Sequence, residues 1–400
     1  MRILVVSSYL PYPLFSGGSI RLYSLLRLLA KNHKITLVCE RRQFQTEDDI
    51  KEMRKICEKV ITVKRRKQWS IKNILKTGFS FNPFLITGHQ SREMTEKIKE
   101  ELMRERYDLI HVETFYVMQN LPVISIPIVL VEHNIEYLVY KRFADKAPFF
   151  VKPLLLADVL KLKRKEEFFW QRATKLVAVS NIEKSIMRRE DVAVVPNGVD
   201  IARFAFRETG NKFHTQEKRV LFIGDFKWMQ NRDGASFLIK EVWPIIRSKL
   251  ETGNSKLDTK LWIVGKNIPE GIKELGANDK SILFDSNNKD ETPVIFDKSF
   301  LLLAPIRIGG GTSYKILEAM ASGTAVVTTN LGIEGLEAKD GIHVLTADDA
   351  HGFAAAAIKL LEDKNLYKTL AKNARKLVEE NYDWNTIAEK LEKVYKSSLS

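Results

Sequence analysis

The stretch Leu303–Gly323, LAPIRIGGGTSYKILEAMASG, decides how the rest of the chain is interpreted. An apolar run over 299–304 predicts a buried strand, three glycines at 309–311 break it, and a helical pattern runs from Thr312 to about Ala321. Glycines between a strand and a helix let the backbone approach a ligand closely, and the helix start behind them presents free N–H groups. The stretch predicts either an anion cradle or an ordinary glycine-rich turn.

Three charged side chains surround this turn. Arg307 precedes the glycines, Lys315 lies in the first helical turn, and Glu318 follows Lys315 by three residues and so shares its helix face. Cations and backbone N–H groups suit phosphates, and a carboxylate beside them suits ribose hydroxyls. The pattern favours a nucleotide diphosphate site, with a solvated Lys–Glu pair as the plain alternative.

Composition indicates a folded protein of two domains. The chain has 400 residues, of which 44% are hydrophobic and 28% charged, enough to bury two cores. Its two cysteines, Cys39 and Cys57, exclude a disulfide scaffold and fit a reducing compartment. The apolar run after Met1 is short and leads into a Pro/Gly loop, which favours a first strand over a signal peptide. With no apolar run of about 18 residues, we expect a cytoplasmic protein.

Strand and helix patterns alternate through both halves of the chain. The opening strand, a loop that holds Gly17 and Gly18, an amphipathic helix over Ile20–Lys31 and the strand ITLVCE (35–40) form a βαβ unit. The pattern becomes polar over 204–218 and then restarts, so we expect two doubly wound parallel-sheet domains that face a cleft. Ligands bind at the carboxyl ends of strands in such sheets, where both glycine-rich loops fall.

At this point the motifs resemble a known family, the retaining glycosyltransferases of family four, which have the GT-B fold. Within that family the chain is most similar to exopolysaccharide-type sugar transferases. The matching segments are ILVVSSYLPYP with SGG near the start, YDLIHVE (107–113), VLVEHNIE (129–136), VAVS (177–180), VPNGVD (195–200), LFIGDF (221–226), LWIVG (261–265), GGGTSYKILEAMASGTAVVTT (309–329) and NYDW (381–384). The segment ILEAMASGTAVVTT is the most specific of them.

The resemblance implies a domain plan and a hexosyltransferase-like activity. Residues 1–203 would form a Rossmann-like acceptor-binding domain and 204–382 a Rossmann-like domain for the nucleotide sugar, while 383–400 would form a helix that packs back on the first domain. The enzyme would move a sugar from a nucleotide diphosphate to a glycan or lipid-linked acceptor in cell-surface polysaccharide biosynthesis. The base, the sugar, the acceptor and the linkage stay open.

The resemblance also assigns roles residue by residue. Glu318 would hold the ribose hydroxyls, Gly310, Gly311 and Thr312 would present N–H groups to the sugar and phosphates, Gly18 would approach the diphosphate, and His133 would lie near the sugar and acceptor. The full donor-binding set is Gly17, Gly18, Lys227, Gly309, Gly310, Gly311, Thr312, Leu317 and Glu318, and the catalytic candidates are His133, Lys315 and Arg307.

Two departures from the family pattern bear on the donor site. Gly310 stands where the family has the first Glu of a Glu-x7-Glu motif, and Asp225 and Gln230 stand where it has two basic residues. Nearby cations (Lys227, Arg307 and Lys315) are expected to replace the lost groups. The alternative is a non-catalytic relative that binds a glycan or nucleotide sugar.

The chemistry expected at the site needs no metal or other cofactor. Asp-x-Asp, paired His and Cys–His sets with ligand spacing are missing from the sequence. Cations and a helix start would instead stabilise the leaving diphosphate, and the family resemblance implies front-face transfer with retention. For His133 the plain alternative is a core histidine, which is the favoured interpretation for His111; Glu166 and Glu167 are expected on a helix with paired charges.

Positive charge concentrates in the first half. The net charge is +12 over residues 1–200 and +2 over the rest. Two stretches, Lys64–Gly88 and Tyr140–Arg172, interleave Lys and Arg with aromatic residues such as Trp69, Phe79, Phe81 and Phe84. No nucleic-acid motif accompanies them, so we expect peripheral contact with an anionic membrane at its inner face, against the alternative of a solvated basic surface.

Overall fold

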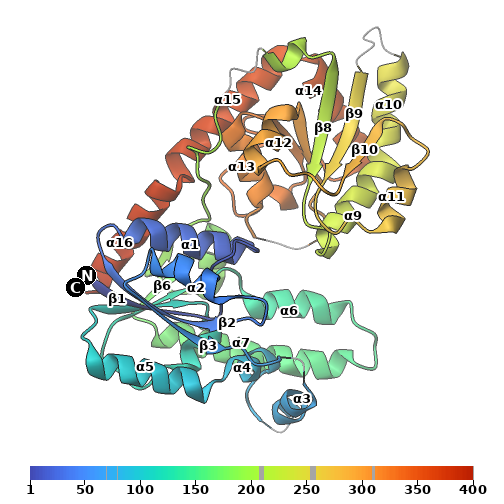
Figure 1. The fold of residues 1–400 in the computed structure, drawn as a ribbon. Helices are drawn as coiled ribbons and strands as arrows, with labels where there is room; N and C mark the ends of the chain where they lie inside the picture. Colours follow the sequence, from blue (N-terminus) through green and yellow to red (C-terminus); the bar gives the residue numbers. More distant parts are fainter. Residues whose placement is uncertain (69, 79, 207–210, 253–257, 309–310, 400) are drawn as a thin grey trace. The chain divides into compact units, whose positions relative to one another are not determined.

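The computed structural model describes residues 1–400 except 69, 79, 207–210, 253–257, 309–310 and 400, and it divides into two compact units (Figure 1). Unit 1 contains Met1–Pro196 with Ile387–Ser400, and unit 2 contains Asn197–Thr386. These divisions fall after Pro196 and Thr386, whereas the sequence predicted domain limits after residues 203 and 382.

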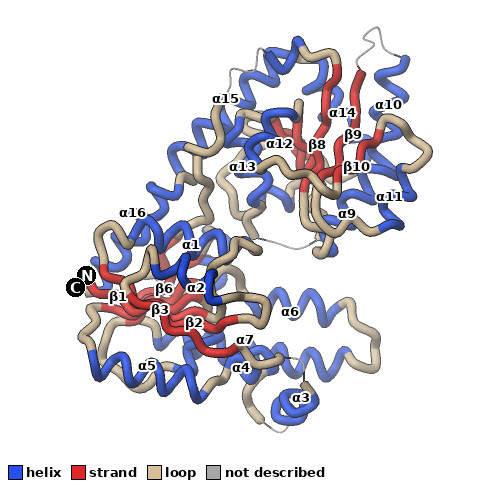
Figure 2. Tube along the Cα trace, viewed as in Figure 1, coloured by secondary structure: helices blue, strands red, loops and turns tan. Residues whose placement is uncertain are grey.

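Unit 1 is built on a seven-stranded parallel sheet in the order β3-β2-β1-β4-β5-β6-β7 (Figure 2). The strands are β1 (Arg2–Ser7), β2 (Lys34–Arg41), β3 (Lys59–Lys64), β4 (Leu109–Glu113), β5 (Ile128–Val131), β6 (Lys175–Ala178) and β7 (Val192–Val194). Central strands such as β4 and β5 are buried along their whole length, because helices cover both faces of the sheet.

The helices of unit 1 are α1 (Gly17–Leu29), α2 (Glu47–Arg54), α3 (Ile71–Gly78), α4 (Phe84–His89), α5 (Arg92–Arg104), the 3₁₀ helix η1 (Phe115–Asn120), α6 (Glu136–Asp145), α7 (Lys152–Arg172) and α8 (Asn181–Met187). The expectation that the first helix begins at Ile20 is wrong. Ser16 caps α1 through reciprocal hydrogen bonds with Ser19, so Gly17 and Gly18 belong to its first turn.

The hairpin of α6 and α7 depends on a buried carboxylate. Glu166 of α7 accepts hydrogen bonds from the backbone N–H groups of Glu136 (2.8 Å) and Tyr137 (2.9 Å), which caps the start of α6. The expected pattern of solvated charge pairs therefore holds for Glu167, which lies 3.8 Å from Lys163, and is wrong for Glu166.

The last helix, α16 (Trp384–Ser398), returns to the first domain as the family resemblance implied. Ile387, Leu391 and Tyr395 are buried in unit 1, and Glu392 lies 3.6 Å from His33. The chain thus leaves unit 1 at Pro196 and completes it with its final residues.

Unit 2 has a six-stranded parallel sheet in the order β10-β9-β8-β11-β12-β13. Its strands are β8 (Glu217–Ile223), β9 (Asp258–Val264), β10 (Ile282–Asp285), β11 (Leu301–Ala304), β12 (Ala325–Thr328) and β13 (Leu345–Thr346). Its α-helices are α9 (Met229–Phe237), α10 (Trp243–Thr252), α11 (Glu270–Gly276), α12 (Thr292–Lys298), α13 (Tyr314–Ser322), α14 (Ala350–Glu362) and α15 (Lys364–Asn381). Its shorter helices are η2 (Asn211–His214), the π-helical turn η3 (Leu238–Val242) and η4 (Leu331–Ile333).

Each sheet reverses its strand order beside its first strand. The reversal lies between β1 and β4 in unit 1 and between β8 and β11 in unit 2. Helices leave toward opposite faces at such a point, and a crevice opens at the carboxyl ends of the two strands. The candidate site of each unit lies at its carboxyl edge.

Candidate active site

In unit 1, His133 is held by a chain of buried hydrogen bonds. Its Nε2 lies 2.5 Å from Oε1 of Glu113, the last residue of β4. The other oxygen of Glu113 lies 2.6 Å from Nε2 of His111, and Nδ1 of His111 lies 2.6 Å from the hydroxyl of Tyr395 on α16. The side chain of Glu113 is fully buried, whereas that of His133 is 17% exposed.

This chain fixes where the protons lie. Burial alone would raise the pKa of Glu113, but the hydrogen bonds and charges of His133 and His111 outweigh it and hold that pKa well below the usual range. A carboxylate only accepts hydrogen bonds, so both histidines carry a proton on Nε2. The other ring nitrogen of His133, Nδ1, faces the first turn of α1. We call the set Tyr395, His111, Glu113 and His133 the histidine chain.

Gly18 leaves room beside His133. A Cβ atom at Gly18 would lie 3.4 Å from Nδ1 of His133 and 3.0 Å from the hydroxyl of Tyr9. Tyr9 in turn donates a hydrogen bond to the carbonyl of Gly18 at 3.2 Å. The first turn of α1 and His133 therefore form one surface at the carboxyl edge of the sheet.

The sequence predicted the role of His111 only in part. His111 is a buried histidine with both ring nitrogens bonded, as the plain interpretation expected, but it also supports His133 through Glu113. Sequence reasoning missed Glu113 and Tyr395. The spacing of His111 and Glu113, two residues apart on one strand, puts them on the same face and could have indicated the pair; nothing local marks Tyr395.

In unit 2, Lys315 lies on the first turn of α13, which begins at Tyr314 rather than at Thr312 as expected. Its Nζ donates a hydrogen bond to Oδ1 of Asn231 at 2.8 Å and lies 4.8 Å from the centre of the Phe222 ring. Asn231 packs on Gly224, where a Cβ would come within 2.6 Å of the Asn231 amide carbon. Asn231, which sequence reasoning also missed, thus joins the loop after β8 to α13.

Lys315 and Glu318 both have perturbed pKa values. Burial lowers the pKa of Lys315 to about 8, although Glu318 counteracts it. Burial raises the pKa of Glu318 to about 7, although the charges of Arg203 and Lys315 lower it in part. Two partly buried ionisable groups with pKa values shifted in this way are characteristic of a site that a charged or polar ligand completes.

Gly311 and Thr312 form the described part of the glycine-rich turn. Gly311 has φ of +83°, a conformation that glycine adopts without strain. The hydroxyl oxygen of Thr312 is buried and, among the described residues, has no hydrogen-bond partner. A buried polar atom of this kind is expected to meet a ligand or water. Gly309 and Gly310 lie outside the described residues.

The remaining donor candidates occupy different surroundings. Arg307 lies against α9, with Nε 3.8 Å from Asp233 and its guanidinium 4.4 Å from the centre of the Phe237 ring. Lys227 is exposed, and its backbone N–H bonds to Asp225. Leu317 is fully buried in the hydrophobic core. Lys315, Glu318 and Thr312 therefore gather on one turn of unit 2, while Arg307 is partly neutralised by Asp233.

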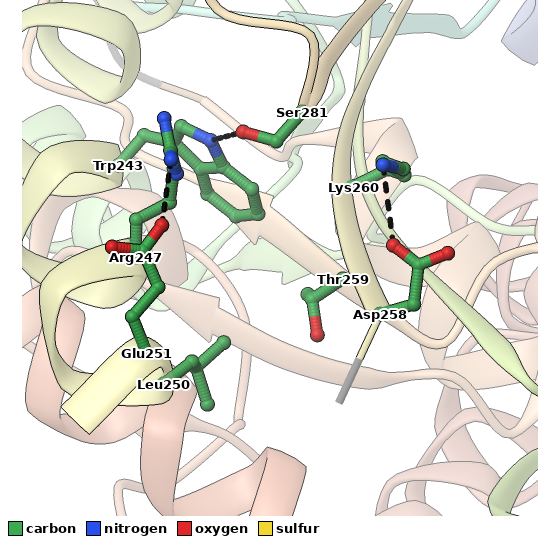
Figure 3. A pocket seen from close by; sticks show the side chains of 8 residues that line it. All are labelled: Trp243, Arg247, Leu250, Glu251, Asp258, Thr259, Lys260 and Ser281. Atoms are coloured by element: carbon green, nitrogen blue, oxygen red, sulfur yellow. Dashed lines mark hydrogen bonds and ion pairs between the residues drawn. The ribbon is translucent and has the colours of Figure 1, made fainter. Parts of the chain in front are cut away.

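Unit 2 also has a hollow of about 430 Å³, which lies away from the glycine-rich turn (Figure 3). It is lined by the starts of β9 and β10 and by α10, at the amino edge of the sheet, opposite the glycine-rich turn. Arg247 is paired with Glu251 and Asp279, and Trp243 donates to Ser281. Its polar groups are satisfied within the protein, so we do not assign the donor to it.

Two parallel-sheet, Rossmann-like units, each with a candidate site at its carboxyl edge, define the GT-B fold. A family model matches each of the two units. "Glycosyltransferase Family 4" matches residues 15–203, and "Glycosyl transferases group 1" matches 217–363. Together the two models span most of the chain and show a glycosyltransferase of the family-four type.

Relatives agree with this assignment. An "uncharacterized 44.6 kDa protein in cps region" of Klebsiella pneumoniae is 26% identical over 396 residues, 96% of each chain. The phosphatidyl-myo-inositol mannosyltransferase of Mycolicibacterium smegmatis is 28% identical over 211 residues, 52% of each chain. The structure of HepE from Anabaena in complex with UDP and glucose has a TM-score of 0.63 at 14% identity, covering 99% of this chain and 100% of that one, and so shares the fold.

Among the described residues, no helix combines the length and apolarity that crossing a membrane requires. Nor, in that part of the chain, do three or more His, Cys, Asp or Glu side chains converge as metal ligands would.

Proposed function

We propose that the protein transfers a sugar, with retention and without a metal, from a nucleotide diphosphate to a glycan or lipid-linked acceptor in cell-surface polysaccharide or glycolipid synthesis. The observation that carries the proposal is the turn at Gly311–Glu318. It combines a left-handed glycine, a buried hydroxyl that has no partner among the described residues, a cation and a carboxylate at the carboxyl edge of a parallel sheet. The UDP and glucose bound by the related Anabaena fold support a donor of this class.

Each group of the turn has a role in binding the donor. Glu318, once ionised, accepts hydrogen bonds from the ribose hydroxyls. The N–H groups of Gly311 and Thr312, with the Thr312 hydroxyl, bond the phosphates, and Lys315 supplies positive charge. Asn231 holds Lys315 in position through the 2.8 Å hydrogen bond to its Nζ.

The chemical step breaks the bond between the anomeric carbon and the phosphate oxygen. Negative charge grows on the leaving diphosphate, and Lys315 with the backbone N–H groups stabilises it. The acceptor hydroxyl attacks from the same face and passes its proton to the departing phosphate oxygen, which gives retention. His133, with Nδ1 directed toward α1, accepts a hydrogen bond from a sugar hydroxyl and orients it.

A second candidate function is a non-catalytic relative that binds a glycan or nucleotide sugar. It is favoured by Gly310, Asp225 and Gln230, which replace groups expected to contact the donor. Such a protein would bind a nucleotide sugar and release no nucleoside diphosphate from it, whereas an enzyme would hydrolyse the donor slowly even without an acceptor.

A thermal-shift screen against nucleoside diphosphates and their sugars tests the donor site. Binding to the folded state raises the melting temperature by mass action. We expect at least one nucleotide to raise that of the wild type and to have little effect on the Glu318→Ala variant. Glu274→Ala, an exposed change on α11, is the matched control. A panel without any shift, or equal shifts in both variants, would contradict the proposed site.

We also propose that unit 1 contacts an anionic membrane surface. Phe149 (87% exposed) and Phe150 (71% exposed) lie in the connection between α6 and α7, flanked by Lys146 and Lys152 (Figure 1). Lys161 of α7 donates hydrogen bonds to carbonyls near Phe81, which is 91% exposed. Exposed aromatic rings among lysines suit the interface of an anionic bilayer. Trp69 and Phe79, which the sequence also indicated, lie outside the described residues.

Flotation with vesicles tests this contact. We expect the protein to float with vesicles that contain phosphatidylglycerol and to stay unbound with phosphatidylcholine alone. Phe149→Ser with Phe150→Ser should reduce binding at low salt, whereas Met103→Ser, an exposed apolar residue on α5, should leave it unchanged. If the wild type stays unbound to anionic vesicles at low salt, the basic surface is merely solvated.

A further inference from the structure

Two arginines stand side by side at the carboxyl edge of the sheet in unit 1. Arg42 directly follows β2 and Arg65 directly follows β3, and these strands are parallel neighbours with Arg41 opposite Lys64. The backbone N–H of Arg65 donates to the carbonyl of Arg41 at 2.9 Å, which continues the register by one residue. The two guanidinium groups therefore project from adjacent positions of one edge.

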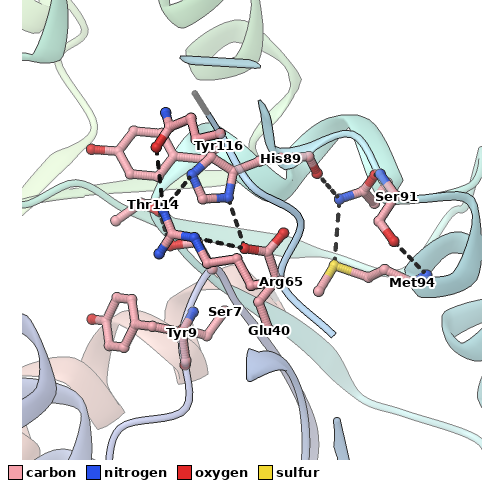
Figure 4. Close-up of polar contacts among 12 residues, drawn as sticks. Ser7, Tyr9, Glu40, Arg65, His89, Ser91, Met94, Thr114 and Tyr116 are labelled. Atoms are coloured by element: carbon pink, nitrogen blue, oxygen red, sulfur yellow. Dashed lines mark hydrogen bonds and ion pairs between the residues drawn. The ribbon is translucent and has the colours of Figure 1, made fainter. Parts of the chain in front are cut away.

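The carboxylate of Glu40 pairs with Arg65. Its Oε2 lies 3.8 Å from Nε of Arg65 and 2.9 Å from Nδ1 of His89, and Glu40 is only 2% exposed. A second contact joins Arg65 to Nε2 of His89 at 3.4 Å. Figure 4 shows Arg65, Glu40 and His89 directed toward one another, with the Tyr116 ring stacked on His89.

The side chain of Arg42 has fewer hydrogen-bond and ion-pair partners than that of Arg65. Its guanidinium lies 4.8 Å from the centre of the Phe15 ring, and its Nε is buried without a hydrogen-bond partner in the described part of the chain. Burial and the charge of Arg65 lower the pKa of Arg42, while Glu40 raises it. Glu40 is thus paired with Arg65 and His89, which leaves excess positive charge and an unused donor on Arg42 at the edge.

The position of this pair relative to His133 suggests what it binds. His133 follows β5, and the strand order from β5 through β4, β1 and β2 to β3 places Arg65 four strands away. At about 4.8 Å between strands this separation is roughly 19 Å. A molecule whose hydroxyl reaches His133 could therefore place a distant group on the arginine pair, provided that it runs along the edge.

We propose that Arg42 and Arg65 form a subsite for an oxyanion of the acceptor, remote from the hydroxyl that receives the sugar. The inference rests on the proposed function, since it names the class of acceptor. A guanidinium fork matches the paired oxygens of a phosphate or a carboxylate. The oxyanion is either the phosphate that joins a glycan to its lipid or the carboxylate of an acidic sugar. Phe15 and the exposed ring of Phe44, 5.5 Å from it, line the approach.

Protection from an arginine-specific reagent tests the subsite without a variant. The full-length protein is treated with phenylglyoxal, and modification of each arginine is followed by peptide mass spectrometry with geranyl diphosphate, glucuronate or neutral glucose present. We expect at least one anion to slow modification of Arg42 and Arg65 several-fold and glucose to have no effect. Arg41, which precedes Arg42 but pairs with Glu47 at 3.6 Å, is the internal control.

The outcomes separate the two sources of the oxyanion. Protection by geranyl diphosphate alone assigns a lipid-linked phosphate, and protection by glucuronate alone assigns an acidic sugar. Unchanged rates at both arginines, or equal protection of Arg41, would overturn the subsite. The nucleotide thermal shift is measured on the same protein: a shift without protection removes only the subsite, whereas protection without a shift leaves an anion site and removes the proposed donor.

Discussion

The histidine chain of unit 1 and the turn at Gly311–Glu318 of unit 2 differ in how far their polar groups are hydrogen-bonded within the protein. In unit 1, His133, Glu113 and His111 are bonded at 2.5–2.6 Å in a chain that ends at Tyr395. In unit 2, the Thr312 hydroxyl is buried without a partner among the described residues. Burial also lowers the pKa of Lys315 to about 8 and raises that of Glu318 to about 7.

This difference separates two ways of building a site. The histidine chain sets the tautomer and orientation of one side chain before any ligand arrives, which lowers the entropic cost of positioning a hydroxyl. The turn of unit 2 leaves polar groups incomplete, so that a nucleotide diphosphate supplies their missing partners. Changes in this turn should therefore affect donor binding and leaving-group stabilisation, and changes in the histidine chain should affect orientation and stability.

The largest effect is expected from Lys315→Ala. Removing a preorganised cation from the leaving diphosphate should lower kcat by about 10²–10³-fold, as for other groups that stabilise developing charge. The measurement is the rate of nucleoside diphosphate release. Lys273→Ala, which removes a surface lysine paired with Glu270, is the control. Unchanged turnover in Lys315→Ala would exclude Lys315 from this role.

The next effect is expected from Glu113→Gln. The amide keeps the shape but loses the charge that both histidines bond, so about 1.5–3 kcal/mol of unfolding free energy should be lost for each charge-assisted bond that fails. If the same free energy is lost from the transition state, kcat should fall by about one to two orders of magnitude, because about 1.4 kcal/mol corresponds to a factor of ten in rate. The readouts are urea unfolding and kcat with its pH profile. A stability loss with an unchanged kcat and pH profile would make Glu113 purely structural.

The pH dependence of nucleotide binding separates the roles of Glu318 and Lys315 in unit 2. Nucleotide affinity should rise as the pH increases through about 7, where Glu318 ionises, and fall as it increases through about 8, where Lys315 loses its proton. Glu318→Gln should abolish the rising limb and Lys315→Arg the falling limb, as measured by calorimetric titration. A flat profile in the wild type would show that neither group controls binding.

The same shift of Glu318 has a consequence for stability. A carboxyl group whose folded-state pKa is raised stabilises the fold below its unfolded-state pKa, and this contribution is lost as the pH rises through about 7. Glu318→Gln should therefore unfold at a higher temperature than the wild type above pH 7 and lose that advantage on acidification. The opposite trend would mean that Glu318 is ionised and satisfied in the free protein.

The smallest effect is expected from Tyr395→Phe. This change removes only the outer hydrogen bond of the histidine chain, so about 1 kcal/mol of stability should be lost. We expect kcat to change by less than about fivefold, because Glu113 still holds His133 directly. An effect on kcat as large as that of Glu113→Gln would show that the chain acts as a unit from α16 to His133.

The sequence predicted most of the fold because its signals are local. Apolar strand runs and the turn at 309–311 identified two parallel-sheet units, and the family motifs identified the closing helix. The start of α1 at Gly17 was missed because the Ser16–Ser19 capping box outweighs the low helix propensity of glycine. The bond between His111 and Tyr395 spans 284 residues, so no local pattern could indicate it.

The cations of the donor turn show a second limit of sequence reasoning. Arg307 and Lys315 were expected to carry the diphosphate together, since both flank the glycines. Arg307 instead packs on Phe237 beside Asp233, and these partners come from α9, which only the tertiary fold brings to Arg307. The role of Lys315 in the donor site stays a prediction, and that of Arg307 requires it to leave Asp233.

The most direct test of the central claim follows the sugar that the purified protein releases from a nucleotide sugar in the absence of acceptor. Proton NMR would record which anomer appears first, and chromatography would record the nucleoside diphosphate. A retaining transferase should release nucleoside diphosphate with the sugar first in the anomeric configuration of the donor, and Lys315→Ala should abolish both. First appearance of the opposite anomer, or release that Lys315→Ala leaves unchanged, would contradict the account.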